Sequence, residues 1–200
     1  MKRSQFDEAV QAFCEFEKKH SKKKYLDYLE QATSESQMQL FFESNPIVLP
    51  GLFDRHNGPY EDIVISKLRL ADEYVTDFAF ISVDSGNAQI TLIEIESPNI
   101  KIFRNSDGQF SAPLNKAIQQ MRDWTSWLST NETFTKDLLR KIYHRSVFRY
   151  QHVISKVILV AGRREQVTQN VQREKRRKNG TAGCPIYFSC PQLGFTARQS

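Results

Sequence analysis

Apolar and polar positions follow two different periods along the chain, and these periods separate helical from extended segments. Near the N-terminus Phe6, Val10 and Phe13 recur every three or four residues, and Leu29 belongs to a second run of the same kind. This spacing places apolar side chains on one side of a helix. The pattern therefore predicts a helical N-terminal arm over residues 1–33.

A further helix is indicated directly after the arm. Ser34-Glu35-Ser36-Gln37 is a capping-box pattern, and the segment that follows it carries Leu40 and Phe41. Asn45-Pro46 should end this helix, because the residue before a proline is pushed away from helical backbone angles. Since neither a linker nor a repeat follows, we expect one domain over residues 34–200.

Three runs with the composition of strands come next, namely Ile63–Leu68, Tyr74–Val83 and Gln89–Ser97. The third run is the most apolar and the richest in β-branched residues, so it should lie in the centre of a sheet. Only turn residues, over 84–87, separate the second run from the third. These two runs should therefore form a tight antiparallel hairpin.

Helical periodicity returns after the loop that follows the third run. One face of this helix carries Leu114, Ala117, Ile118, Met121, Thr125 and Leu128. We then predict a buried strand at Val157–Val160, a basic helix over Glu165–Asn179 and a short strand at Ile186–Phe188. The resulting order, α-β-β-β-α-β-α-β, defines the α/β class.

Composition restricts the class further. The chain has 200 residues, 40% hydrophobic and 26% charged, which suits one domain with a substantial core. It has no apolar run near the ~20 residues of a membrane helix and no secretory-signal pattern, so we expect no membrane partner and a cytoplasmic location. Cys14, Cys184 and Cys190 lack the spacing of a zinc knuckle and should be reduced and structural. The four histidines are isolated, which argues against zinc-deaminase or histidine-nuclease chemistry.

Positive charge is concentrated in two segments. The formal net charge is +5, and Arg163–Lys178 alone holds seven Lys and Arg residues. A second basic run spans Lys18–Lys24. Clustered positive charge suits a polyanionic partner such as nucleic acid, whereas the alternative is a helix face that merely meets solvent.

Acidic residues give the most specific chemical signal. An even-length turn centred on Ser85 and Gly86 would place Asp77 opposite Glu94, with Cβ atoms roughly 5 Å apart. Glu96 follows on the same face, displaced by about 6.6 Å. Three carboxylates that converge beside an otherwise apolar strand must protonate or bind a cation, and all-oxygen ligation favours Mg²⁺ or Mn²⁺. The alternative is that Glu94 and Glu96 lie on the solvated face of an edge strand.

The same residues carry a family resemblance. Thr76-Asp77-Phe78, Glu94-Ile95-Glu96-Ser97-Pro98 and the helix with Ala117–Trp124 together resemble the PD-(D/E)XK nuclease superfamily. Phe42–Leu49 and Ile158–Arg163 are more narrowly similar to the Shedu antiphage-defence nuclease domain. The resemblance covers residues 35 to 195 approximately. It implies a restriction-endonuclease-like core, α-β-β-β-α-β, with a central mixed sheet.

The resemblance also implies an activity, which is metal-dependent hydrolysis of phosphodiester bonds, of DNA with RNA as an alternative, in defence against phage or other invading DNA. Asp77 and Glu94 would hold Mg²⁺ or Mn²⁺. Gln120 would orient a ligand, a water or the phosphate, and Trp124 matches the aromatic position of the motif.

One position departs from the superfamily pattern. Glu96 stands where a lysine is usual, two residues after the second acid. Glu96 could bind metal or accept a proton from water. Lys101 or Lys116 could supply a displaced amine, although each also suits an ordinary surface position. Glu43 is an additional candidate ligand, or else a surface acid at a helix end.

The sequence therefore leaves three candidate functions. The first is the nuclease, with metal at Asp77, Glu94 and Glu96. The second is a non-catalytic nucleic-acid-binding or interaction module on the same fold, and the third is a structural protein. The first two bind phosphates through Arg163, Arg164, Arg173, Lys175, Arg176 and Arg177. A homo-oligomer is compatible with the sequence.

Overall fold

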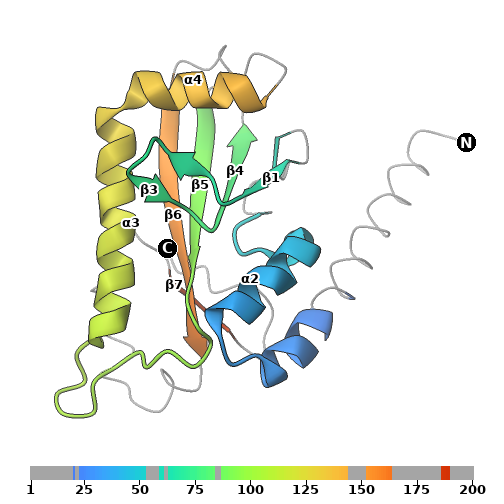
Figure 1. Cartoon of the computed structure of the whole chain (residues 1–200), viewed down its shortest axis with the longest axis vertical. Coiled ribbons are helices and arrows are strands. Elements are labelled where there is room, and N and C mark those ends of the chain that lie inside the picture. The colour runs from blue at the N-terminus through green and yellow to red at the C-terminus, as the bar shows by residue number, and fades with distance from the viewer. Residues whose placement is uncertain are drawn as a thin grey trace, which may run out of the picture.

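The computed structural model describes residues 20, 23–52, 59–60, 63–83, 87–143, 152–163 and 186–189. Figure 1 shows a central sheet with a long helix, α3, along one side and α2 on the other. The chain is thus a mixed α/β protein, as predicted. Phe6, Val10 and Phe13 lie outside the described residues, as does the predicted basic helix over 165–179.

Helix α2 begins and ends where the sequence predicts. It spans Glu35–Ser44, and a helix over 23–31 precedes it within the range predicted for the arm. The capping box of α2 is confirmed, because the Ser34 hydroxyl accepts from the Gln37 amide while the Gln37 side chain accepts from the Ser34 amide. Asn45 caps the C-terminus of α2, and the short 3-10 helix η1 follows at Pro46–Val48.

The main sheet has five strands in the order β1-β4-β5-β6-β7. These strands are β1 at Val64–Ser66, β4 at Phe78–Val83, β5 at Asn87–Ile95, β6 at His152–Arg163 and β7 at Ile186–Ser189. The pairs β1–β4 and β4–β5 are antiparallel, whereas β5–β6 and β6–β7 are parallel. The sheet is therefore mixed, and the apolar strand β5 lies at its centre, as expected.

The register of the predicted hairpin is confirmed. Phe78 pairs with Ile93 and Val83 pairs with Ala88, which is the alignment that faces Asp77 toward Glu94. Because a slip of one residue would turn every side chain of β5 to the other face, this register decides which acids can meet.

The predicted strand over Tyr74–Val83 is wrong in its first part. The chain forms β3 at Tyr74–Val75, which pairs with β2 at Arg69–Leu70 in a separate two-stranded sheet. Lys67 and Ala71 both have positive φ angles, 54° and 52°, which turn the chain away from β1 and into this small hairpin. The turn leaves Thr76 and Asp77 between β3 and β4.

Two apolar cores lie on the two faces of the sheet. The core toward α3 includes Leu92, Leu159 and Trp124, and the core toward α2 includes Phe42 and Ile93. Residues of odd and even number on β5 thus face opposite cores, as strand geometry requires. Trp124, the aromatic of the predicted motif, is fully buried in the first core.

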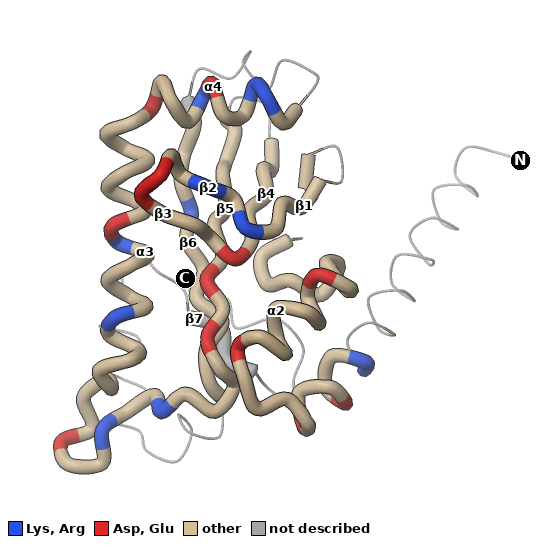
Figure 2. The backbone as a smooth tube through the Cα atoms, in the orientation of Figure 1, with Lys and Arg blue, Asp and Glu red and all other residues tan. Residues whose placement is uncertain are grey.

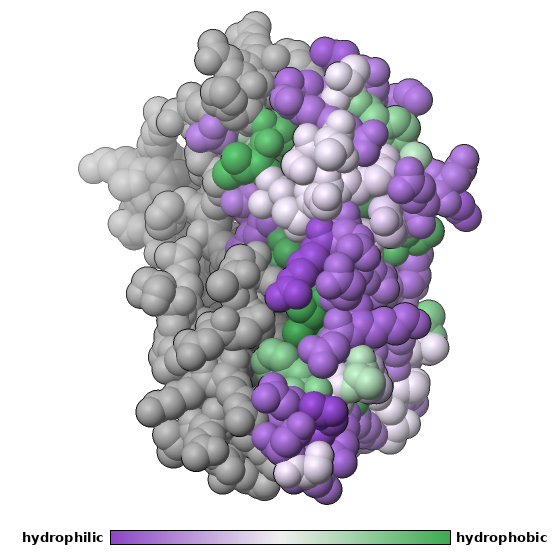
Figure 3. All heavy atoms as spheres, turned by 90° about the vertical axis from the view of Figure 1, so that its left-hand side faces the viewer, coloured by the Kyte–Doolittle hydropathy of each residue, from purple (hydrophilic) through white to green (hydrophobic). Residues whose placement is uncertain are grey.

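The helical segment after β5 is longer than the sequence analysis predicts. The predicted helix is confirmed as α3, which spans Ala112–Thr130 and begins at Ser111, whose hydroxyl accepts from the Leu114 amide. A second helix, α4 at Glu132–Ile142, follows at the Asn131 junction and was not predicted. The exposed side of α3 forms a largely hydrophilic surface with small apolar patches (Figure 3). No described helix has the length and apolar content to cross a membrane.

Candidate acidic site at the end of the central strands

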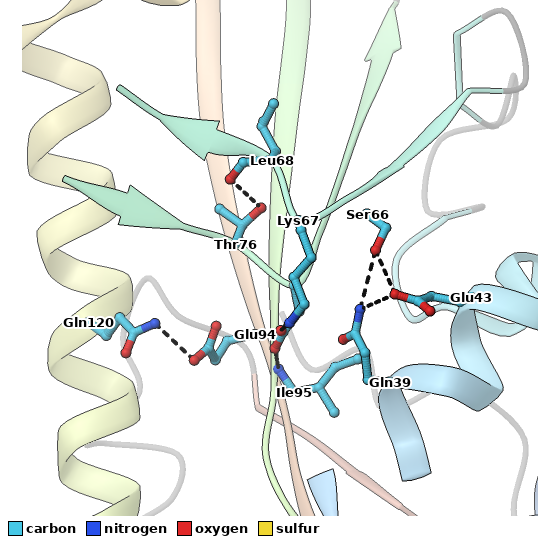
Figure 4. A network of polar contacts seen from close by, with 10 residues as sticks. Gln39, Glu43, Ser66, Lys67, Leu68, Thr76, Glu94, Ile95 and Gln120 are labelled. Carbon is cyan, nitrogen blue, oxygen red and sulfur yellow. Dashed lines mark hydrogen bonds and ion pairs between the residues drawn. The ribbon is translucent and has the colours of Figure 1, made fainter. Parts of the chain in front are cut away.

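Asp77 is the most firmly held acid of the site. Its side chain is 8% exposed, and its Oδ2 atom accepts a hydrogen bond of 2.7 Å from the backbone amide of Ile95. Its Oδ1 atom lies 2.5 Å from the Lys67 Nζ atom. A backbone amide of β5 and an ammonium group thus fix the carboxylate where β3 passes into β4 (Figure 4).

Glu94 contacts the long helix α3. The Gln120 side chain extends from α3, and its Nε2 atom donates a hydrogen bond of 2.9 Å to the Glu94 Oε1 atom. This is the direction expected for Gln120, toward the acids of the strands. The neighbouring Trp124 anchors the same helix in the core, so the amide group is presented from a rigid element.

The acidic side chains strongly affect each other's protonation. Burial, followed by the charges of Asp77 and Glu96, raises the pKa of Glu94 to about 9, while Lys67 acts in the opposite direction. Burial also raises the pKa of Glu96, with Glu35 and Asp77 adding to the effect and Lys116 opposing it. A cation placed among these acids would relieve the repulsion.

Lys67 and Glu35 belong to the site, although sequence reasoning did not select them. Desolvation alone would lower the pKa of Lys67, but hydrogen bonding and charge from Asp77, together with Glu35 and Glu94, outweigh it and raise that pKa. Figure 2 shows acidic positions together where β4, β5 and the start of α2 approach one another, with a basic position beside them. In the sequence, Glu35 is recognisable only as part of the capping-box pattern. No sequence pattern links Lys67 to Asp77.

Glu43 lies in a neighbouring polar cluster on the other side of Lys67 (Figure 4). Its Oε1 atom accepts hydrogen bonds of 2.8 Å from both Gln39 and Ser66, and the same two hydrogen bonds lower its pKa. The Gln39 Oε1 atom is buried and has no hydrogen-bond partner within the described part of the chain. Glu43 thus lies near the site with both of these hydrogen bonds on one oxygen, and its role as a ligand stays a prediction.

The predicted phosphate-binding residues are mostly outside the described residues. Arg164, Arg173, Lys175, Arg176 and Arg177 all lie there. Arg163 is described, and its Nη2 atom donates to the backbone oxygens of Leu29 and Ala32, at 2.8 and 3.2 Å. Its guanidinium group therefore satisfies carbonyls at the end of the helix over 23–31. Contact between these residues and nucleic acid stays a prediction.

The donor chemistry of the site suits a hard divalent cation, although its side chains are not gathered as a three-carboxylate cage. Among the described residues, no group of three or more His, Cys, Asp or Glu side chains could hold a metal ion together. Mg²⁺ is commonly bound by one or two carboxylates, with waters and substrate oxygens completing its shell. Asp77 and Glu94, which face each other across the hairpin, meet that smaller requirement in residue type.

Fold and site together define a mixed α/β protein with one buried and several partly buried acids beside a lysine, at the end of its central antiparallel strands. No curated protein matches the chain. The model of the family described as Shedu protein SduA, C-terminal, matches residues 32–182. The chain belongs to this Shedu family, which associates it with antiphage defence. The resemblance to Shedu predicted from the sequence is confirmed.

Proposed function

We propose that this protein is a metal-dependent nuclease of the PD-(D/E)XK type, which hydrolyses phosphodiester bonds of invading DNA. The observation that carries the proposal is the meeting of Asp77, Glu94 and Gln120, which come from separate elements. The mixed sheet, with an antiparallel hairpin followed by a parallel strand after α3, supports a restriction-endonuclease-like core. Membership of the Shedu family supports the role in defence.

In this proposal Asp77 and Glu94 would hold Mg²⁺ or Mn²⁺. The ion, when bound, supplies Lewis-acid activation of a phosphate oxygen and of water. The Ile95 amide holds one oxygen of Asp77 in place, and Gln120 orients the Glu94 carboxyl group through its amide. Glu96, whose charge acts on Glu94, is the candidate to accept the proton that leaves the attacking water.

DNA binding in this proposal depends on the basic segment Arg163–Lys178. Lysine and arginine side chains that neutralise phosphates release counterions from the nucleic acid, so affinity falls as salt rises. RNA offers the same phosphate charge. A comparison of matched DNA and RNA strands in the cleavage assay would separate the two substrates.

A second function is favoured by one specific observation. Both oxygens of Asp77 already have partners in the protein, Lys67 and the Ile95 amide, and Glu96 stands at the usual lysine position. A site that has lost its metal could keep this arrangement as a structural element. The chain would then be a nucleic-acid-binding or interaction module on the same fold.

A cleavage assay on linear and circular DNA in Mg²⁺ or Mn²⁺ decides between the two functions. The wild type should cut, and Asp77→Asn or Glu94→Gln should lower the rate by about 10² or more, since electrostatic and acid–base groups commonly contribute that much. Asp137→Asn is the matched control, because Asp137 is an exposed acid on α4, at the opposite end of the sheet (Figure 1). Wild-type protein that binds DNA yet cuts none would establish the interaction module instead.

A further inference from the structure

The connection after β1 holds a lysine in a backbone conformation that lysine rarely adopts. Lys67 follows Ser66, the last residue of β1, and has a φ angle of 54°. This is the left-handed region, which is disfavoured for residues with a Cβ atom and persists only when surrounding contacts enforce it. Such positions occur preferentially at functional sites, so the contacts that hold Lys67 need an explanation.

Backbone and side chain of Lys67 both contact Asp77. The Lys67 amide donates a hydrogen bond of 2.9 Å to the Asp77 carbonyl oxygen, and the Nζ atom lies 2.5 Å from the Asp77 Oδ1 atom. The first acid of the site is therefore bound twice by the same lysine. The main-chain hydrogen bond continues the antiparallel register of β1 and β4, in which Ser66 faces Phe78, and so holds Lys67 opposite Asp77.

The position of the Lys67 ammonium group matters because Glu96 stands where the superfamily motif usually has a lysine. In the superfamily motif a lysine lies two residues after the second acid, and in this chain that position is an acid. Lys67 reaches the same carboxylates from the end of the neighbouring strand β1. Lys116, one of the candidates for a displaced amine, acts to lower the pKa of Glu96. Within the described residues, Asp77 forms its ion pair with Lys67.

We propose that Lys67 is the catalytic lysine of this site and contacts the scissile phosphate, an inference that rests on the proposed nuclease function. Its side chain is 50% exposed, so the ammonium group has room to turn from Asp77 to a substrate. In hydrolysis the oxygen of water bonds to phosphorus, one phosphorus–oxygen ester bond breaks, a base takes the proton of water, and the leaving oxygen is protonated. Lys67 stays protonated throughout and balances the negative charge that grows on the phosphate.

In the absence of substrate and metal, the same ammonium group neutralises Asp77. A divalent ion that binds Asp77 must therefore take the place of Lys67 at the Oδ1 atom. Removing the ammonium group should leave metal affinity unchanged or make it tighter, while cleavage is lost. This combination separates a group that contacts the substrate from one that merely builds the carboxylate site.

Three variants of the full chain test the proposal, namely Lys67→Met, Lys67→Arg and the control Lys141→Met. Lys141 is an exposed lysine near the end of α4. Each is measured for cleavage rate constants and for Mn²⁺ affinity by calorimetry. Lys67→Met should lower kcat by about 10² or more with Mn²⁺ affinity at or above the wild-type value, since charge-stabilising groups contribute rates of that order.

Rescue gives the sharper readout. Lys67→Arg should recover at least tenfold over Lys67→Met, because arginine keeps a positive charge at this position. Lys141→Met should match the wild type.

Each remaining outcome counts against a specific claim. Wild-type cleavage by Lys67→Met would overturn the role of Lys67 and leave the nuclease function intact. A fall of more than tenfold in Mn²⁺ affinity in Lys67→Met would show that Lys67 builds the site instead of acting on the substrate. A wild type that cuts neither DNA nor RNA would overturn the proposed function, and the role of Lys67 with it.

Discussion

The raised pKa of Glu94 leads to a prediction about the pH dependence of stability. Burial and neighbouring acids raise this pKa to about 9 in the folded, metal-free protein, from the ordinary value of 4.5. Between these two values the native state holds a proton that the unfolded chain has released. The stability that Glu94 contributes is therefore complete below about pH 4.5 and is lost as the pH rises toward 9.

The magnitude follows from the number of protons. One proton of difference changes the free energy of unfolding by about 1.4 kcal/mol for each pH unit. Over the two units from pH 6 to 8, Glu94 alone should remove about 2 to 3 kcal/mol. Glu94→Gln keeps the shape of the protonated acid and the partner for Gln120, but it cannot ionise, so this loss should disappear.

Urea unfolding in EDTA, from pH 5 to 9, measures the effect as the difference between wild type and Glu94→Gln. We expect Glu94→Gln to gain stability relative to the wild type as the pH rises. Glu132→Gln, an exposed acid on α4, is the control and should run parallel to the wild type. Parallel curves for Glu94→Gln and the wild type would refute the electrostatic reasoning. Adding Mg²⁺ should stabilise the wild type more than Glu94→Gln, most clearly at high pH, where a cation replaces the proton.

Three further predictions concern other parts of the chain. Gly162→Ala should lower the free energy of unfolding by about 1 to 3 kcal/mol, measured by urea unfolding, because Gly162 has a φ of +61° and a Cβ there would lie 2.4 Å from the Ile102 Cδ1 atom. Ser34→Ala removes the capping box of α2 and should cost about 1 kcal/mol in the same measurement. Reversing two charges in the basic segment over 163–178 should weaken binding to all DNA sequences alike and reduce its salt dependence, measured by filter binding. Unchanged binding would show that the segment faces solvent and does not contact DNA.

The parts of the fold that depend on local pattern could be predicted from the sequence. The capping box at Ser34 and the apolar face of α3 are local signals, and both mark real helices. The hairpin register follows from the length of one turn, which is why the pairing of Asp77 with Glu94 could be worked out by counting residues. The helical period alone was enough to predict that the Gln120 side chain points toward the sheet.

The parts that depend on tertiary contacts could not be predicted. Continuous β-type residues over Tyr74–Val83 gave no sign that the chain breaks into β3 and β4, because the break is enforced by positive φ angles at Lys67 and Ala71. The contact of Lys67 with Asp77 joins the residue that follows β1 to the residue that precedes β4. The helix α4 is a different case, because its apolar residues at 134, 138, 139 and 142 do follow a helical period and could have revealed it.

The hydrogen bonds of Arg163 to the helix over 23–31 have a consequence for biosynthesis. The donor lies 134 residues after Leu29 and 131 after Ala32. A ribosome makes the chain from its N-terminus, so the helix leaves the exit tunnel long before its C-terminal carbonyls can find this partner. Contacts between such distant residues form late, after much of the intervening chain has been ordered. Nascent chains that stop before Arg163 therefore cannot complete the hydrogen bonds at this end of the helix, which should be among the last contacts of the fold to form.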